Sequence, residues 1–204
     1  MLACSVPSLV MPQLGRDVAH ALYRSGVMRR RATRNAASAF AAIDFETANS
    51  SRDSACAVAI VRVENAIVVA KHRWLLRPPT PEFSFTHVHG IAWRDVRNAP
   101  TFSEAWPEAA RLAAGVEFLA AHNASFDRSV LYACARFAGM RLPATPFQCS
   151  MLLARHRLGI YPTTLPEVCR RLAIPLRHHD VLSDAEACAR IVIATAGGRG
   201  VGPP

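Results

Sequence analysis

Two adjacent histidines in the stretch HHDVLSDAEA, residues 178–187, are followed by Asp180 and Asp184. An imidazole whose pKa lies near neutrality can take a proton from water, and a carboxylate can hold a cation. The same residues are also typical of a polar loop before a helix, where an acid favours the positive end of the helix dipole. The choice between these interpretations depends on whether further carboxylates meet Asp184 in the fold.

Three other acids accompany apolar stretches of the chain. Asp44 and Glu46 lie two residues apart in AFAAIDFET, residues 39–47, whose composition predicts a buried strand. Because side chains alternate along a strand, both carboxylates project to the same face. Asp127 comes after VEFLAAHN, residues 116–123, and is expected in the first turn of the next helix. Taken alone, each acid could be a solvated loop residue or a helix-end residue.

As a group, four carboxylates suit hard divalent cations such as Mg²⁺ or Mn²⁺. Two such ions about 4 Å apart can hold both the attacking and the leaving oxygen of a phosphodiester displacement. One ion lowers the pKa of a bound water, and the other stabilises the leaving 3′ oxyanion. This scheme also needs a base, for which His178 and His179 are both available.

The pattern that follows residue 38 predicts an α/β fold. Residues 55–76 are typical of two β-branched strands joined by a turn near Glu64. Helical and strand patterns then alternate, and Ser183 with Glu186 predicts a capping box at the start of the last helix. This order predicts a mixed sheet flanked by helices, and open α/β sheets commonly place ligand sites at the ends of strands.

The composition limits the class of protein. The chain of 204 residues is 51% hydrophobic, which fits one domain with a short extension. No apolar run is long enough to cross a membrane as a helix. The six cysteines are scattered without a Cys-x-x-Cys pair, which indicates free thiols and a cytoplasmic protein. A zinc site formed by Cys169, Cys188 and the two histidines is disfavoured, because both cysteines fall inside predicted helices.

The net charge of +9 favours a polyanionic partner. Residues 1–38 hold six arginines and one acid, so the remainder carries +4, and Lys71 is the only lysine. We expect residues 1–38 to be a basic, flexible extension, either an arm or a segment similar to a transit peptide. Residues 39–197 are predicted to form the folded domain, and residues 198–204 a flexible tail.

Several stretches together resemble the DEDDh 3′–5′ exonucleases, the DnaQ-like group that includes the proofreading epsilon subunit of bacterial DNA polymerase III. They occur in the order of that family and cover about residues 39–196. The segments with HNASFD and with a histidine five residues before an aspartate make the match strong. The stretches are DFET at 44–47, FTHVHGI at 85–91, AAHNASFD at 120–127, CSMLLAR at 149–155, LPEVCRRLAIP at 165–175 and HHDVLSDAEACA at 178–189.

The resemblance implies a ribonuclease H-like fold, with a mixed five-stranded sheet flanked by helices. It implies that four acids bind two Mg²⁺ or Mn²⁺ ions, namely Asp44, Glu46, Asp127 and Asp184. It selects His179 as the base, since the family's histidine lies five residues before the last aspartate. A sister group has a tyrosine four residues before that aspartate, where this chain has Asp180. His178 is then expected to pack beside His179 or to face solvent.

The resemblance also implies substrate contacts. Thr47 would lie beside the terminal nucleotide, while Val88 and His89 would pack on the sugar and base of the 3′ end. Asn123 would hydrogen-bond near the scissile region. Phe126 would offer an apolar or stacking face to a base, and stacking of this kind is largely independent of sequence. Val88 and Phe126 could equally be core residues.

We therefore expect a metal-dependent exonuclease that hydrolyses single-stranded DNA from its 3′ end to nucleoside 5′-monophosphates. The alternatives are an enzyme that trims RNA 3′ ends by the same mechanism, a phosphodiesterase that acts on small nucleotides, and an inactive nucleic-acid-binding module. The expected partner is the 3′ end of a single strand, and no membrane. No stable association with a polymerase is expected, because no tail like that of the proofreading subunit follows the last motif.

Overall fold

The computed structural model describes residues 39–142 and 144–197. All elements named below belong to the compact unit Ala37–Pro204. The predictions of a basic extension at residues 1–38 and of a tail at residues 198–204 lie outside the described residues.

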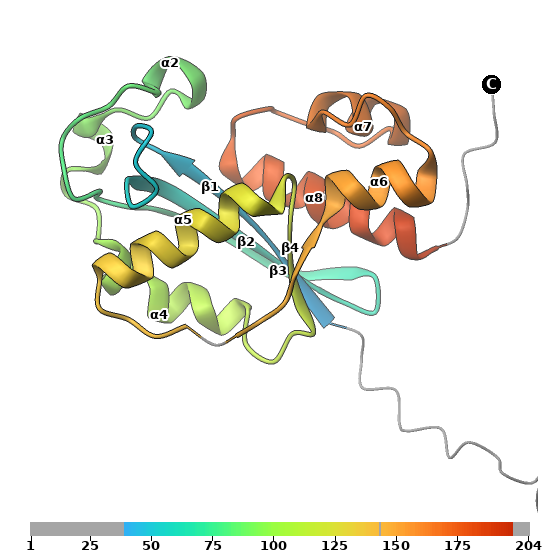
Figure 1. Cartoon of the computed structure of the whole chain (residues 1–204), viewed down its shortest axis with the longest axis horizontal. Helices are drawn as coiled ribbons and strands as arrows, with labels where there is room; N and C mark the ends of the chain where they lie inside the picture. Colours follow the sequence, from blue (N-terminus) through green and yellow to red (C-terminus); the bar gives the residue numbers. More distant parts are fainter. Residues whose placement is uncertain (1–38, 143, 198–204) are drawn as a thin grey trace, which may run out of the picture. The chain divides into compact units, whose positions relative to one another are not determined.

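Five strands form one mixed sheet in the order β3-β2-β1-β4-β5, so that β1 is the central strand (Figure 1). β2 is antiparallel to both β1 and β3. β4 is parallel to β1 on one side and to β5 on the other. This confirms the predicted mixed five-stranded sheet. The strands are β1 (Ala39–Thr47), β2 (Ala55–Glu64), β3 (Ile67–Leu75), β4 (Phe118–Ala121) and β5 (Phe147–Cys149).

Helices connect the later strands and cover the sheet. The one-turn helices α2 and α3 are not evident in the sequence pattern, while the longer helices follow it closely. The helices are α2 (Thr86–His89), α3 (Trp93–Val96), α4 (Phe102–Leu112), α5 (Ala124–Phe137), α6 (Ser150–Leu158), α7 (Leu165–Leu172) and α8 (Val181–Ala196).

The central strand β1 contributes to a separate apolar core on each face of the sheet. Its residues Ala41, Ile43 and Phe45 pack with α4 and α5 on one face. Phe40 and Ala42 pack with α8 on the other face. Because side chains alternate along the strand, Asp44 and Glu46 continue the row that faces α8. The two acids therefore point toward the helix that carries Asp184.

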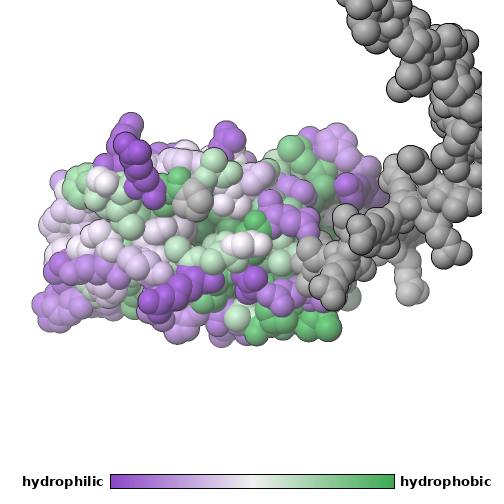
Figure 2. Space-filling model, turned by 90° about the horizontal axis from the view of Figure 1, so that it is seen from below, coloured by the Kyte–Doolittle hydropathy of each residue, from purple (hydrophilic) through white to green (hydrophobic). Residues whose placement is uncertain are grey.

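A further apolar cluster joins α6 and α7 to the middle of α8, where Ala187 and Ile191 are buried. The surface mixes residue types, and Figure 2 shows hydrophobic patches in green among hydrophilic areas in purple. Among the described residues, no helix combines the length and apolar character needed to span a membrane. Five cysteines are free thiols in this part of the chain, namely Cys56, Cys134, Cys149, Cys169 and Cys188.

Candidate active site

Asp127 is fastened directly to the central strand. β4 runs parallel to β1, with Ala120 opposite Ala42, so the end of β4 lies next to the acidic end of β1. Asn123 then adopts a left-handed conformation at φ 67°, which turns the chain into α5. In the first turn of α5, Asp127 accepts a hydrogen bond from the backbone N–H of Phe45 at 3.1 Å. This bond places its carboxylate beside the row formed by the acids of β1.

The last helix begins earlier than the sequence analysis predicts. Asp180, and not Ser183, is the N-cap of α8, and its carboxylate accepts a hydrogen bond from the N–H of Ser183 at 3.1 Å. Glu186, the expected partner of a Ser183 cap, instead pairs with Lys71 and with Arg190. The predicted Ser183 cap was wrong because Asp180, three positions earlier, is also a good capping residue and is the N-cap in the structure. Asp184 consequently lies one turn inside α8 and is buried.

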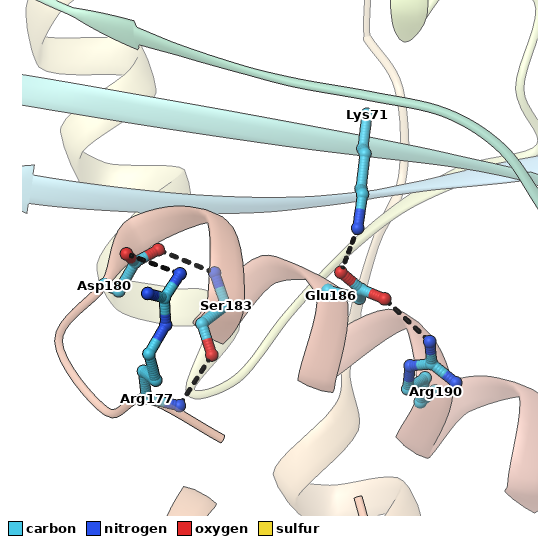
Figure 3. A network of polar contacts seen from close by, with 6 residues as sticks. All are labelled: Lys71, Arg177, Asp180, Ser183, Glu186 and Arg190. Atoms are coloured by element: carbon cyan, nitrogen blue, oxygen red, sulfur yellow. Dashed lines mark hydrogen bonds and ion pairs between the residues drawn. The ribbon is translucent and has the colours of Figure 1, made fainter. Parts of the chain in front are cut away.

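The loop that carries the two histidines, residues 177–180, is closed by a polar network (Figure 3). The N–H of Asp180 donates to the carbonyl oxygen of Arg177 at 3.0 Å, which makes a tight turn with both histidines at its tip. The hydroxyl of Ser183 accepts from the N–H of Arg177 at 2.8 Å, and the guanidinium of Arg177 lies 3.4 Å from the Asp180 carboxylate. His179 is held at φ 68°, a left-handed conformation that non-glycine residues adopt rarely.

Both histidines contact Asp184. His178 Nδ1 lies 3.1 Å from Asp184 Oδ2, and the backbone N–H of His179 donates to the same oxygen at 3.0 Å. The two imidazole rings stack with centroids 3.8 Å apart. Among the described residues, the ring of His179 has no hydrogen-bond partner, whereas His178 is bound to the carboxylate. Sequence spacing does not predict this contact of His178, because it selects only one of the two histidines.

One groove of about 400 Å³ collects all the residues predicted for the site. Its lining includes the four acids and His179, with the apolar side chains of Phe85 and Leu165 alongside. Val88 stands on its wall with 39% of its surface exposed, so it is not a core residue. The five residues predicted to touch substrate also line it: Thr47, Val88, His89, Asn123 and Phe126.

His89 is tied to the backbone through both ring nitrogens. Its Nδ1 accepts from the N–H of Ile91 at 3.1 Å, and its Nε2 lies 3.1 Å from the carbonyl oxygen of Thr47. Because Nδ1 is an acceptor, the proton must reside on Nε2, which donates to Thr47. His89 therefore braces α2 against the end of β1, and only its ring surface is left to meet a ligand.

His122, to which the sequence analysis gave no role, forms another wall of the groove. Its Nδ1 lies 2.9 Å from the hydroxyl of Ser150, and its Nε2 lies 2.9 Å from the carbonyl oxygen of Thr163. These contacts tie the end of β4 to α6 and to the segment before α7. Burial lowers the pKa of His122, so the neutral imidazole is favoured at this position.

Phe126 is half-buried and already has a cationic neighbour. The guanidinium carbon of Arg52 lies 4.5 Å from the centroid of the Phe126 ring. Such a cation–π contact brings a positive charge to the edge of the acidic groove. A base that stacks on Phe126 must therefore use the ring surface that Arg52 does not cover.

The pKa of each of the four acids is raised, and burial is the largest cause in every case. Burial contributes most for Asp44, followed by the charges of Asp127, Asp184 and Glu46. Burial and the nearby aspartates raise the pKa of Glu46 to about 8, and burial raises that of Asp127 to about 7. The pKa of Asp184 is also raised by burial, against the opposing hydrogen bond from His179. Carboxylates in such a cluster need cations for full ionisation near neutral pH.

The donor set fits divalent cations. Asp44, Glu46 and Asp184 each offer a carboxylate oxygen, and these atoms all lie within 4.8 Å of one another. Asp184 Oδ1 is buried without a hydrogen-bond partner in the described part of the chain, so this acceptor faces the cluster unsatisfied. Oxygen-only carboxylate clusters of this kind are typical of Mg²⁺ and Mn²⁺ sites.

The metal-free protein is expected to lose stability as these acids ionise. Because their pKa values are raised, the folded chain binds more protons than the unfolded chain between about pH 4 and pH 8. The stability that the protonated acids contribute is therefore full at low pH and is lost as the pH rises through 7 and 8. Asp44→Asn should unfold at a higher temperature than wild type in EDTA, and the difference should widen from pH 5 to pH 8. Thermal unfolding followed by circular dichroism measures it.

Added Mn²⁺ gives the matching control for this prediction. At a concentration of 100 times its Kd, the cation should stabilise the wild type by about 2.7 kcal/mol at pH 8 and Asp44→Asn by much less. A difference between the two proteins in EDTA that stays constant with pH would contradict the assignment of the raised pKa values.

Comparisons with known proteins agree with this geometry. A family model described as exonuclease (RNase T) matches residues 41–192. The fold is similar to that of Exonuclease X in complex with 5′ overhanging duplex DNA, with a TM-score of 0.64 and 24% identity over 78% of this chain and 91% of that chain. It is similar to the nuclease domain of 3′hExo, a DEDDh family member bound to rAMP, with a TM-score of 0.69 and 16% identity over 80% and 94%.

A third similar structure is E. coli Exonuclease I in complex with a dT13 oligonucleotide, with a TM-score of 0.64 and 16% identity over 78% of this chain and 40% of that chain. No curated protein sequence matches the chain. The family model spans most of the described residues, and the four acids and His179 line one groove. The chain therefore belongs to this family of exonucleases.

Proposed function

We propose that the chain is a metal-dependent 3′–5′ exonuclease that hydrolyses single-stranded DNA ends to nucleoside 5′-monophosphates. The observation that carries the proposal is the convergence of the four acids and His179 in one groove. The side chains come from β1, α5, α8 and the loop before α8. The hydrogen bond from the N–H of Phe45 to Asp127 fastens α5 to β1, and the bond from the N–H of His179 to Asp184 fastens the loop to α8.

Asp44, Glu46 and Asp184 would hold the cations, and Asp127 completes the set from the α5 side. When bound, a pair of divalent cations supplies charge stabilisation at the scissile phosphate and an attacking oxygen at neutral pH. The backbone N–H of His179 keeps the Asp184 carboxylate oriented through the bond to Oδ2, while Oδ1 remains available as a ligand atom.

His179 is the proposed general base. Burial and the neighbouring His178 lower its pKa, so the ring is neutral at pH 7 and can accept a proton. The ring lines the groove and is stacked on His178, which itself is bound to Asp184. The imidazole thus stands beside the acidic cluster with its ring nitrogens free of protein contacts within the described residues.

The groove offers the remaining elements that a nucleic acid end requires. Val88 and Phe126 provide apolar surface for a sugar or base, and Asn123 provides an exposed polar side chain at the start of α5. Structural neighbours hold DNA in two cases and a ribonucleotide in one, which supports nucleic acid as the substrate class. The ribonucleotide keeps RNA 3′-end trimming as the second candidate.

The free thiols support the proposal that the enzyme acts in the reducing environment of the cytoplasm.

The test is digestion of matched single-stranded DNA and RNA oligonucleotides labelled at the 5′ end, with Mn²⁺, with Mg²⁺ or with EDTA. We expect ladders of products shortened from the 3′ end, nucleoside 5′-monophosphates by chromatography, no reaction in EDTA and faster digestion of DNA. Faster digestion of RNA would favour the second candidate. Binding without cleavage would indicate an inactive module, and cleavage of mononucleotide esters alone would indicate a small-molecule phosphodiesterase.

A further inference from the structure

A second groove, of about 340 Å³, lies at the far end of α5 from the catalytic residues. Phe102 and Cys134 form its buried floor. Phe137 lines it with 66% of its surface exposed, and Trp93 lines it in a half-buried position. An aromatic side chain as large and exposed as Phe137 in the last turn of a helix adds little to the core. The combination of an apolar floor and aromatic walls is typical of a ligand groove.

The β1–β2 loop, residues 48–54, contacts α5 beside both grooves. Phe126 and Phe137 are eleven residues apart, which is close to three full turns, so both lie on the same side of the helix about 16 Å apart. Arg52 connects the two positions. Its guanidinium covers Phe126, and its carbonyl oxygen accepts a hydrogen bond from Cys134 Sγ at 3.7 Å. The next residue, Asp53, lines the second groove.

The charges around the second groove suit a polyanion. Arg77 lines it with an exposed side chain, and neither Arg77 nor Arg52 forms an ion pair with any described residue. The carboxylate of Asp53 is engaged by the hydroxyl of Ser51, so its charge is partly satisfied within the loop. Free guanidinium groups beside aromatic rings are the features with which proteins hold single-stranded nucleic acid without reading its sequence.

We propose that the second groove binds a base of the substrate strand upstream of the cleaved nucleotide, with Phe137 and Trp93 as the stacking surfaces and Arg77 on a phosphate. This inference rests on the proposed function. The catalytic groove binds the 3′ end, so any part of the same strand that extends outside this groove lies on the 5′ side of the cleaved nucleotide. At about 3.4 Å per stacked nucleotide, and more when extended, the 16 Å between the phenylalanines corresponds to roughly three to five nucleotides.

Length dependence tests the proposal. The wild type should show a higher kcat/KM on a ten-nucleotide single strand than on a trinucleotide, because only the longer strand reaches the second groove. In Phe137→Ala, the ratio of kcat/KM values for the two lengths should fall by about 5- to 100-fold, the effect of losing one stacked base. Tyr132→Ala is the matched control, since Tyr132 is an exposed aromatic residue of α5 outside both grooves, and it should leave the ratio at the wild-type value.

Binding in EDTA separates this proposal from the proposed function. Anisotropy of labelled ten- and three-nucleotide strands should show weaker binding of the longer strand by Phe137→Ala and by Arg77→Gln. Arg77→Gln should also reduce the salt dependence of binding by about one phosphate contact. A wild type that cleaves neither strand refutes the proposed function. The binding measurement in EDTA still shows whether the second groove binds the longer strand. Equal losses for both lengths, or no change in Phe137→Ala, would overturn the proposal and leave the groove to another ligand, such as a peptide.

Discussion

Asp44→Ala is expected to abolish turnover while the fold survives. The charges of the other three acids all raise the pKa of this side chain, so it lies close to each of them, and its removal takes away one of the proposed metal ligands. The loss should reach at least about 10³-fold in kcat, because bound cations contribute several kcal/mol and each 1.4 kcal/mol is tenfold. Asp184→Ala should have a similar effect, since it removes the buried Oδ1 acceptor.

The measurement is a single-turnover assay in saturating Mn²⁺, with circular dichroism to verify the fold. Glu108→Ala serves as the control, because Glu108 is an exposed carboxylate on α4 away from the groove, and it should turn over like the wild type. If Asp44→Ala kept more than a tenth of wild-type turnover in saturating metal, the assignment of the acidic cluster as the catalytic centre would be rejected.

His179→Ala is expected to lower kcat by about 10²- to 10⁴-fold, the usual scale for a general base. His178→Ala should cost about tenfold or less, because a single hydrogen bond is worth about 0.5–1.5 kcal/mol and the N–H of His179 still holds the same oxygen of Asp184. Rates of product formation under saturating substrate and metal compare the two variants with the wild type.

The pH profile distinguishes a base from a merely structural residue. The pKa of His179 is lowered, so the wild-type rate should rise with pH only up to this lowered pKa and then level off. His179→Ala should lose this rising limb, and His178→Ala should keep it. An unchanged limb in His179→Ala would assign the base to another group, for which His178 is the nearest candidate in the structure.

The sequence predicts the position of the two acids on β1 because strand periodicity alone determines which face they share. An uninterrupted apolar run fixes the strand, and the two-residue repeat then places Asp44 and Glu46 on one face. The HNASFD segment likewise places Asp127 in the first turn of a helix. The sequence does not reveal the hydrogen bond from the N–H of Phe45 to Asp127. The two residues are 82 positions apart, and only the packing of α5 on the sheet brings them together.

Two features of the site depend on tertiary contacts that local patterns cannot show. Both Asp180 and Ser183 could cap the start of α8, and Asp180 is the N-cap in the structure. Glu186, the expected partner of a Ser183 cap, pairs instead with Lys71 on β3. The contact of His178 with Asp184 depends on the tight turn at residues 177–180, which exposes both rings to the same carboxylate. The domain limits outside residues 39–197 stay predictions.

The pairing of β3 with α8 has a practical consequence. Lys71 is the only lysine of the chain, its side chain is about half exposed, and its ammonium group pairs with Glu186 two residues beyond Asp184. An amine-reactive fluorophore would therefore label a single side chain of the protein, next to Glu186 of the last helix (Figure 3). Acylation there would also neutralise the cation that joins β3 to α8 through Glu186.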